Sequence, residues 1–207
     1  MTFDDLIDTL IKRKALIVHC SRPGKANEGT DALLFPHDMK NATEICANQH
    51  KDLSCSVVWP QHIKTFGAVG IILRPRSTSS IMSICNSDAG TWIDPQTGKK
   101  HGDGVPFSAQ AVNDTFANPT NYNEWTVTDA DTVGIFINFS EPLEVAKVTD
   151  VTKMPGYDPA MGHQDPTVVA QPISLKEIMD AFPTLPIYAY CGTELSQIGL
   201  DMAVIYS

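Results

Sequence analysis

The sequence lacks the cysteine patterns that mark metal-binding and disulfide-stabilised proteins. It has five cysteines, an odd number, and no two of them show CxxC spacing. Zinc knuckles and disulfide frameworks are built from regularly spaced pairs. We therefore expect no metal site and no disulfide framework, and we interpret most of the cysteines as small buried hydrophobic residues. The HExxH motif of metalloproteases and the GxSxG motif of α/β-hydrolases are also missing.

Positive charge and long apolar runs are both scarce. The chain has 15 Lys and Arg against 24 Asp and Glu, which gives a net charge of -9. A protein that grips nucleic acid along its length needs clustered cations, so extended nucleic-acid binding is not favoured. No apolar run approaches a membrane span, and the acidic start lacks the basic and apolar regions of a signal peptide. These absences predict a cytoplasmic protein with no membrane partner.

The length and composition are those of one folded domain. The chain has 207 residues, of which 43% are hydrophobic and 19% charged, enough to fill a single core. We predict one domain over residues 1–207 with its core at about 15–148. A loop-rich excursion is expected over 150–172, followed by a C-terminal helix and strand segment over 173–207.

Hydrophobic periodicity and capping residues predict both helices and strands. The predicted helices span 3–14, 38–50, 108–117 and 175–182. The predicted strands span 15–19, 53–59, 68–73, 80–84, 124–128, 132–139, 143–148, 187–190 and 202–206. Asp38 is expected to cap the second helix, Ser174 and Glu177 to form a capping box on the fourth, and residues 86–106 to form a loop. The fold class expected from this pattern is α+β.

The most informative local feature is a carboxylate next to a large aromatic side chain. Glu124 is followed by Trp125 at the head of an expected strand. A tryptophan of this kind tends to be buried, which would hold the neighbouring carboxylate in place and partly desolvate it. Carboxylates beside buried aromatics recur as acid–base groups in enzymes, so Glu124 is a candidate catalytic residue.

A second polar cluster follows the first expected strand, at His19-Cys20-Ser21-Arg22. With the residues above, this cluster resembles the ADP-ribosyltransferases of the diphtheria-toxin and poly-ADP-ribose-polymerase type. The resemblance rests on the His-x-Ser triplet with Pro23-Gly24 behind it, a central strand leading to a serine-bearing turn between Gly67 and Ile84, and then Glu124. It covers residues 15–140, and it implies a compact α+β domain with a central, largely antiparallel split sheet and a few peripheral helices.

The resemblance also implies a reaction and a role for each residue. The implied activity is NAD-dependent mono-ADP-ribosylation of a macromolecule, protein or nucleic acid, by a toxin or effector, with NAD as the substrate. His19 would bind a ribose hydroxyl, Ser21 the nicotinamide amide and Arg22 the pyrophosphate. Glu124 would be catalytic, because a carboxylate stabilises the oxocarbenium-like state in which the nicotinamide–ribose bond breaks.

Two assignments within the resemblance stay open. The serine element corresponds either to Ser54 and Ser56, at the start of an expected strand, or to the turn beginning at Ser77. No tyrosine precedes Tyr122 in the chain, so the aromatic surface that the nicotinamide stacks on would come from another residue, with Trp59 or Phe66 as candidates. Tyr122 also stands where arginine-modifying members carry Gln or Glu, so arginine is not the expected acceptor.

Two hypotheses from other functional classes remain. The chain could be a non-catalytic binding or immunity-type module in which Glu124 has a structural role. It could also be a cysteine hydrolase that uses Cys20 with His37 or His62. The transferase hypothesis requires that His19 and Glu124, 105 positions apart in the sequence, face the same small cleft.

Overall fold

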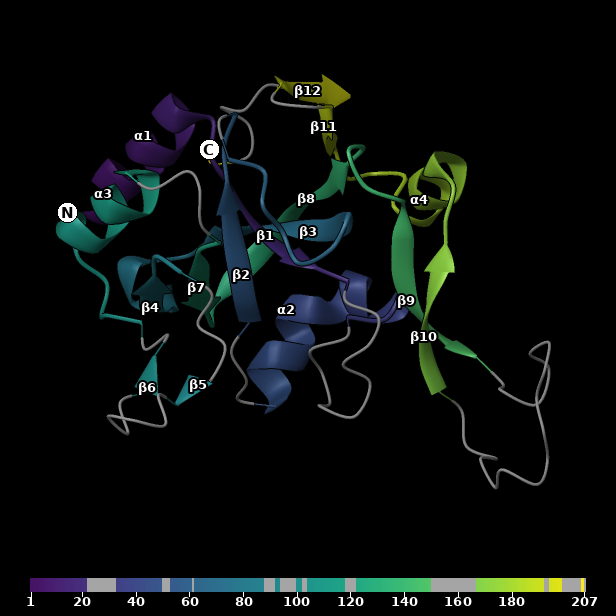
Figure 1. Ribbon diagram of the computed structural model, residues 1–207, viewed down its shortest axis with the longest axis horizontal. Helices are drawn as coiled ribbons and strands as arrows, with labels where there is room; N and C mark the ends of the chain where they lie inside the picture. Colours follow the sequence, from purple (N-terminus) through teal and green to yellow (C-terminus); the bar gives the residue numbers. More distant parts are fainter. Residues whose placement is uncertain are drawn as a thin grey trace.

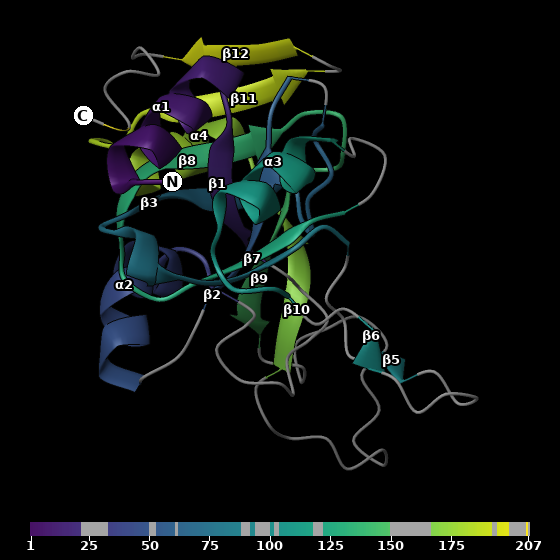
Figure 2. The same cartoon turned by 90° about the vertical axis from the view of Figure 1, so that its left-hand side faces the viewer.

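The fold is built around a broad, mostly antiparallel sheet with helices packed against it (Figures 1 and 2). It comes from a computed structural model. The structure describes residues 1–21, 33–49, 53–60, 62–87, 92–93, 100–101, 104–117, 122–149, 167–191, 194–198 and 206. The predicted α+β class is confirmed. Within the described residues, no helix combines the length and apolar character needed to cross a membrane.

Four α-helices lie within the described part of the chain. They are α1 (Phe3–Arg13), α2 (His37–Gln49), α3 (Ala109–Ala117) and α4 (Leu175–Ala181). Helix α1 begins at a capping box between Thr2 and Asp5 and ends at Lys14, which adopts a left-handed conformation with φ 53°. The predicted capping box of Ser174 and Glu177 on α4 is confirmed.

The central sheet has eight strands in the described part of the chain, in the order β12-β11-β8-β3-β1-β2-β7-β4. Among these strands, β11 and β8 alone run parallel. The strands are β1 (Leu16–Cys20), β2 (Leu53–Val58), β3 (Val69–Pro75), β4 (Ile81–Cys85), β7 (Glu124–Val127), β8 (Ala130–Asn138), β11 (Ile187–Cys191) and β12 (Glu194–Ile198). Two small antiparallel pairs lie beside it: β9 (Glu144–Thr149) with β10 (Thr167–Pro172), and β5 (Trp92–Ile93) with β6 (Lys100–His101).

The two central strands, β1 and β2, pair with each other over only part of their length. Strands β1 and β2 pair over Leu16–Val18 and Ser56–Val58. Beyond these pairs, His19 and Cys20 of β1 pair with β3, whereas residues 53–55 of β2 pair with β7. The second half of β1 and the first half of β2 therefore belong to different ladders, and the backbone groups between them are accessible to side chains.

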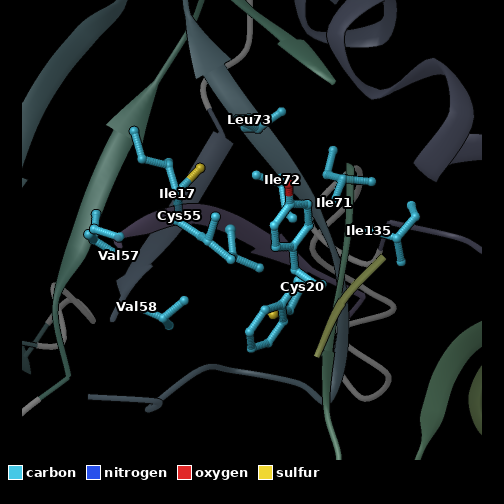
Figure 3. Close-up of a cluster of buried hydrophobic side chains, with 14 of the residues drawn as sticks. Ile17, Cys20, Cys55, Val57, Val58, Ile71, Ile72, Leu73 and Ile135 are labelled. Carbon is cyan, nitrogen blue, oxygen red and sulfur yellow. The ribbon is translucent and has the colours of Figure 1, made fainter. Parts of the chain in front are cut away.

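The core lies along the middle strands. Figure 3 shows side chains from β1, β2, β3 and β8 gathered in one buried cluster, with Ile17, Val57, Ile71 and Ile135 fully buried. Helices α1 and α3 lie side by side, with the Arg13 guanidinium 5.3 Å from the centre of the Phe116 ring, and both views place α2 away from them (Figures 1 and 2). The residues around the candidate site are thus carried by the best-packed strands.

One glycine allows the close approach of β1 and β3 beside His19. A Cβ atom at Gly70 would lie 2.7 Å from the His19 carbonyl oxygen and 2.9 Å from a Val18 methyl carbon. Both distances are shorter than real Cβ contacts, and the nearer atom is backbone that cannot swing away. The end of β1 that carries His19 is therefore held tightly against β3.

Several expectations about local structure are corrected. Helix α2 begins at His37, directly after Pro36, whose fixed φ suits the start of a helix. Asp38 is consequently inside the first turn and not at the cap, and its carboxylate accepts a hydrogen bond from the Leu34 N–H at 3.2 Å.

Regions expected to be loops also contain strands. Residues 92–93 and 100–101, within the expected loop 86–106, pair as β5 and β6. The excursion expected over 150–172 ends in β10, because the β-branched residues from Thr167 onward find the edge of β9 and form six residue pairs with it. Strand β12 was not expected, and the predicted strand at 202–206 lies outside the described residues except for Tyr206.

Candidate functional site

Three of the predicted site residues meet across three neighbouring strands. His19 is on β1, Ser54 on β2 and Glu124 on β7, and the sheet order places these strands side by side. His19 Nδ1 lies 2.6 Å from the Ser54 carbonyl oxygen, and Ser54 Oγ donates a hydrogen bond to Glu124 Oε1 at 2.8 Å. Residues far apart in the sequence are thus joined through a single serine.

The protonation of the His19 ring follows from its surroundings. The imidazole is 3% exposed, and its Nδ1 faces a carbonyl oxygen, which only accepts hydrogen bonds. Nδ1 must therefore carry a proton, which leaves Nε2 as the acceptor nitrogen of the neutral ring. The Ser54 carbonyl is within reach of His19 because the ladder between β1 and β2 ends at Val18 and Ser56.

Glu124 is fixed by the burial of both of its neighbours in the sequence. Trp125 is fully buried, and its indole Nε1 donates to Thr115 Oγ1 on α3 at 3.1 Å. On the other side, Asn123 is 2% exposed. Because side chains alternate along a strand, the Glu124 carboxylate points away from these two anchors and toward Ser54, where it is half-buried. The predicted burial of Trp125 is confirmed.

Asn123 is joined to the sheet by its side chain. Its Oδ1 accepts from the Val57 N–H at 2.7 Å, and its Nδ2 donates to the Val57 carbonyl at 2.8 Å. Nδ2 also lies 3.0 Å from His62 Nε2. Sequence reasoning gave Asn123 no anchoring role, although its position directly before Glu124 was the available signal.

The face of the sheet around Glu124 is polar. Ser54 and Ser83 both pair with Thr126, and Cys85 pairs with Glu124. Directly paired residues in an antiparallel ladder share a face, and Ser83 Oγ donates to Thr126 Oγ1 at 2.9 Å. Hydroxyl, carboxylate and thiol groups thus line one face of β2, β7 and β4, while Trp125 and its neighbours on the opposite face enter the core.

Ser21 has a different position from the one that the resemblance implies. It is fully buried, its Oγ donates to the Leu33 carbonyl at 2.8 Å, and the Ala146 N–H donates to the same oxygen at 2.9 Å. Its own N–H donates to the Val69 carbonyl at 2.8 Å. In this structure the hydroxyl and the amide of Ser21 connect β1 to β3, to β9 and to the segment before α2.

The two candidate serine elements differ in their contacts. Ser77 follows β3 and begins the short 3-10 helix Thr78–Ser80, where its Oγ lies 2.8 Å from Ser79 Oγ. His19 pairs with Ile71 near the start of β3, six residues before Ser77, which is about 20 Å along an extended strand. Ser54 therefore contacts Glu124 and His19, whereas the Ser77 hydroxyl contacts the hydroxyls of Ser79 and Ser80 within its own turn.

The other predicted cofactor-binding residues are distributed as follows. Ser56 is 2% exposed and pairs with Val18, on the face of β2 shared with Ser54. Trp59, also 2% exposed, stacks on His62 with ring centres 4.3 Å apart and forms a T-shaped pair with Phe116. Trp59 is therefore part of the core. Arg22 lies outside the described residues.

An aromatic pair lies next to Glu124 in the chain. Phe66 and Tyr122 stack with ring centres 5.1 Å apart and planes 15° from parallel, and Lys64 Nζ is 5.6 Å from the Tyr122 ring centre. Tyr122 is 38% exposed. Of the two aromatic residues proposed for stacking, Phe66 is thus the one associated with the segment that carries Glu124.

The residues of the cysteine-hydrolase hypothesis are used elsewhere in the fold. Cys20 is 4% exposed. His37 is on α2, where its Nδ1 lies 2.9 Å from Asp38 Oδ1, and the His62 ring contacts Trp59 and Asn123. These contacts offer no support for a catalytic pair built on Cys20.

Comparison with known proteins does not assign the chain to a family. No known protein-family model and no curated protein matches the sequence.

In the part of the chain that the structure describes, no group of three or more His, Cys, Asp or Glu residues is arranged to hold a metal ion.

Proposed function

We propose that the chain is an NAD-dependent ADP-ribosyltransferase in which Glu124 is the catalytic carboxylate. The observation that supports this proposal best is the pair of contacts made by Ser54: its carbonyl oxygen lies 2.6 Å from His19 Nδ1, and its Oγ donates to Glu124 Oε1 at 2.8 Å. The change of partners between β1 and β2 also agrees with the split sheet that the sequence resemblance implies.

The chemistry needs a fixed negative charge beside the ribose. The bond between the ribose C1′ and the nicotinamide nitrogen breaks, and its electron pair goes to the ring nitrogen, which releases neutral nicotinamide. A nucleophile of the acceptor then bonds to C1′ and loses its proton. Positive charge accumulates on the ribose between these events, so a carboxylate held in place lowers the barrier electrostatically.

Each residue of the site has a distinct part in this proposal. His19 Nε2 is buried, so the His19 ring would orient the Ser54 backbone through the contact of its Nδ1 with the Ser54 carbonyl oxygen. Ser54 would hold the Glu124 carboxylate in one orientation, with the second carboxylate oxygen directed at the ribose. Ser54, rather than Ser77, is therefore taken as the serine element, and Ser21 is assigned a structural role.

The direct test is nicotinamide release from NAD by the wild type and by Glu124→Gln. The substitution keeps the size of the side chain and removes its charge, so we expect the rate to fall on the order of 10²–10³-fold, as when other preorganised electrostatic groups are removed. Glu141→Gln is the matched control, because Glu141 is an exposed carboxylate in the turn after β8. Equal rates in the wild type and Glu124→Gln would refute the catalytic role.

Binding of NAD separates this proposal from a non-catalytic module. At a concentration about 100 times its Kd, a ligand adds about 2.7 kcal/mol to the stability of the folded state. For a chain of this length that corresponds to a rise in Tm of about 5–11 °C. We expect the wild type and Glu124→Gln to show this rise. If NAD causes no rise in Tm and no nicotinamide is released, the result favours the binding or immunity-type module.

A further inference from the structure

We propose that Asn123 is a positioning residue that holds Glu124 in register with Ser54. This inference rests on the proposed function for its catalytic consequence, but its structural part is testable without it. It starts from the ladder between β2 and β7, which begins at the pair Cys55 and Trp125. On the β2 side Glu124 therefore lies just before the paired part of this ladder, whereas on its other side it pairs with Cys85 of β4.

The Asn123 side chain adds a contact two residues beyond the pair of Cys55 and Trp125. Its amide exchanges two hydrogen bonds with Val57, of 2.7 and 2.8 Å, in the same donor and acceptor pattern that a paired strand residue would use. Val57 is at the same time paired with Ile17 of β1. The side chain of Asn123 thus anchors the start of β7 to the strand that also carries Ser54.

The orientation of this amide is determined by its partners. Its Oδ1 must face the Val57 N–H, because only an oxygen accepts, and its Nδ2 must face the Val57 carbonyl. His62 Nε2, 3.0 Å from Nδ2, is then the acceptor of a second hydrogen bond, so the neutral His62 ring carries its proton on Nδ1. A flipped amide would place oxygen against both acceptors, which leaves one stable arrangement.

The three-bonded amide lies on one side of Glu124 and the buried Trp125 indole on the other. With both neighbours fixed, the Glu124 backbone has little freedom to rotate, and its carboxylate reaches Ser54 Oγ at 2.8 Å. Loss of the Asn123 amide would free one side. We therefore expect the hydrogen bond between Ser54 and Glu124 to weaken when Asn123 is replaced, even though neither of its partners changes.

The first experiment measures that hydrogen bond through protein stability. A double-mutant cycle with Ser54→Ala and Glu124→Ala, followed by urea unfolding, gives the coupling between the two side chains, which we expect to be a factor of about 2–10 in the unfolding equilibrium constant. In the Asn123→Ala background the coupling should fall to less than about 1.5-fold. Full coupling in that background would overturn the proposal.

The matched control is Asn138→Ala. Asn138 is also 2% exposed, ends strand β8 and accepts a hydrogen bond from the Ser140 N–H at 3.0 Å. We expect it to lower stability and leave the coupling intact. If Asn123→Ala does not fold, His62→Phe keeps a ring against Trp59 but removes one of the three partners of the amide. Coupling that is undiminished in His62→Phe would then overturn the proposal.

The second experiment measures catalysis. If Asn123 positions Glu124, its replacement should lower kcat for nicotinamide release by about 10–100-fold and change KM for NAD by less than about twofold, because a displaced carboxylate affects the transition state more than ground-state binding. A rise in KM with unchanged kcat would contradict positioning. If the wild type releases no nicotinamide, the proposed function fails while the coupling experiment still decides the role of Asn123.

Discussion

Replacing Ser54 by alanine removes the hydroxyl that joins β2 to the Glu124 carboxylate. A hydrogen bond to a charged group contributes about 1.5–3 kcal/mol when buried, but both side chains here are half-buried. We therefore expect a loss of about 1 kcal/mol in the free energy of unfolding, or about 2–4 °C in Tm. The released carboxylate should also lower kcat for nicotinamide release by about tenfold, since one orienting contact is lost.

Ser83→Ala provides the comparison for this prediction. Ser83 lies on the same face of the sheet, is half-buried, and donates to Thr126 of β7 at 2.9 Å. Replacing Ser83 should have a similar effect on Tm and leave kcat unchanged, because the hydrogen bond of Ser83 is with Thr126 and not with Glu124. Urea unfolding and nicotinamide release on the same samples measure both effects. A loss of kcat that is equal in the two variants would refute a specific role for Ser54.

Three further results are expected from stability measurements. Ser21→Ala should lower the free energy of unfolding by about 1–3 kcal/mol in thermal or urea unfolding, because two buried backbone groups lose their partner; an unchanged stability would show that its hydroxyl is dispensable. Gly70→Ala should cost about 1–3 kcal/mol through overpacking, and a neutral effect would contradict the close approach of β1 and β3. The hydrogen bond from the Arg76 guanidinium holds the pKa of Asp131 below its usual value. That pair stabilises the fold above about pH 4 and ceases to do so as the pH falls through the lowered pKa. The difference in Tm between the wild type and Arg76→Gln should therefore shrink as the pH falls below about 4 and Asp131 becomes protonated; a constant difference would contradict it.

The sequence predicted the parts of the fold that are specified locally. The α1 and α4 helices have capping boxes within four residues, and the β3 run of uncharged, β-branched residues needs no partner to be recognised. Strand β10 was predicted as part of a loop because Thr167–Pro172 becomes a strand only through the edge of β9. Pairings of this kind depend on residues distant in the sequence, which periodicity does not reveal.

The candidate site shows the same division. The side chains of His19 and Glu124 were identified from their types and their order along the chain. The choice between Ser54 and Ser77 could not be made, because both are serines beside a strand and only their hydrogen-bond partners in the folded chain distinguish them. Asn123 was missed as an anchor because its partners, Val57 and His62, are more than 60 positions away.

The change of partners at β2 has a mechanical consequence. His19 lies in the ladder between β1 and β3, and Glu124 lies in the ladder between β7 and β4. Three residue pairs between β1 and β2 join these two parts of the sheet. The separation of the His19 imidazole and the Glu124 carboxylate therefore depends on how these two parts of the sheet twist relative to each other at the three pairs. Core substitutions at those three pairs would tune the spacing of the two groups without touching either one.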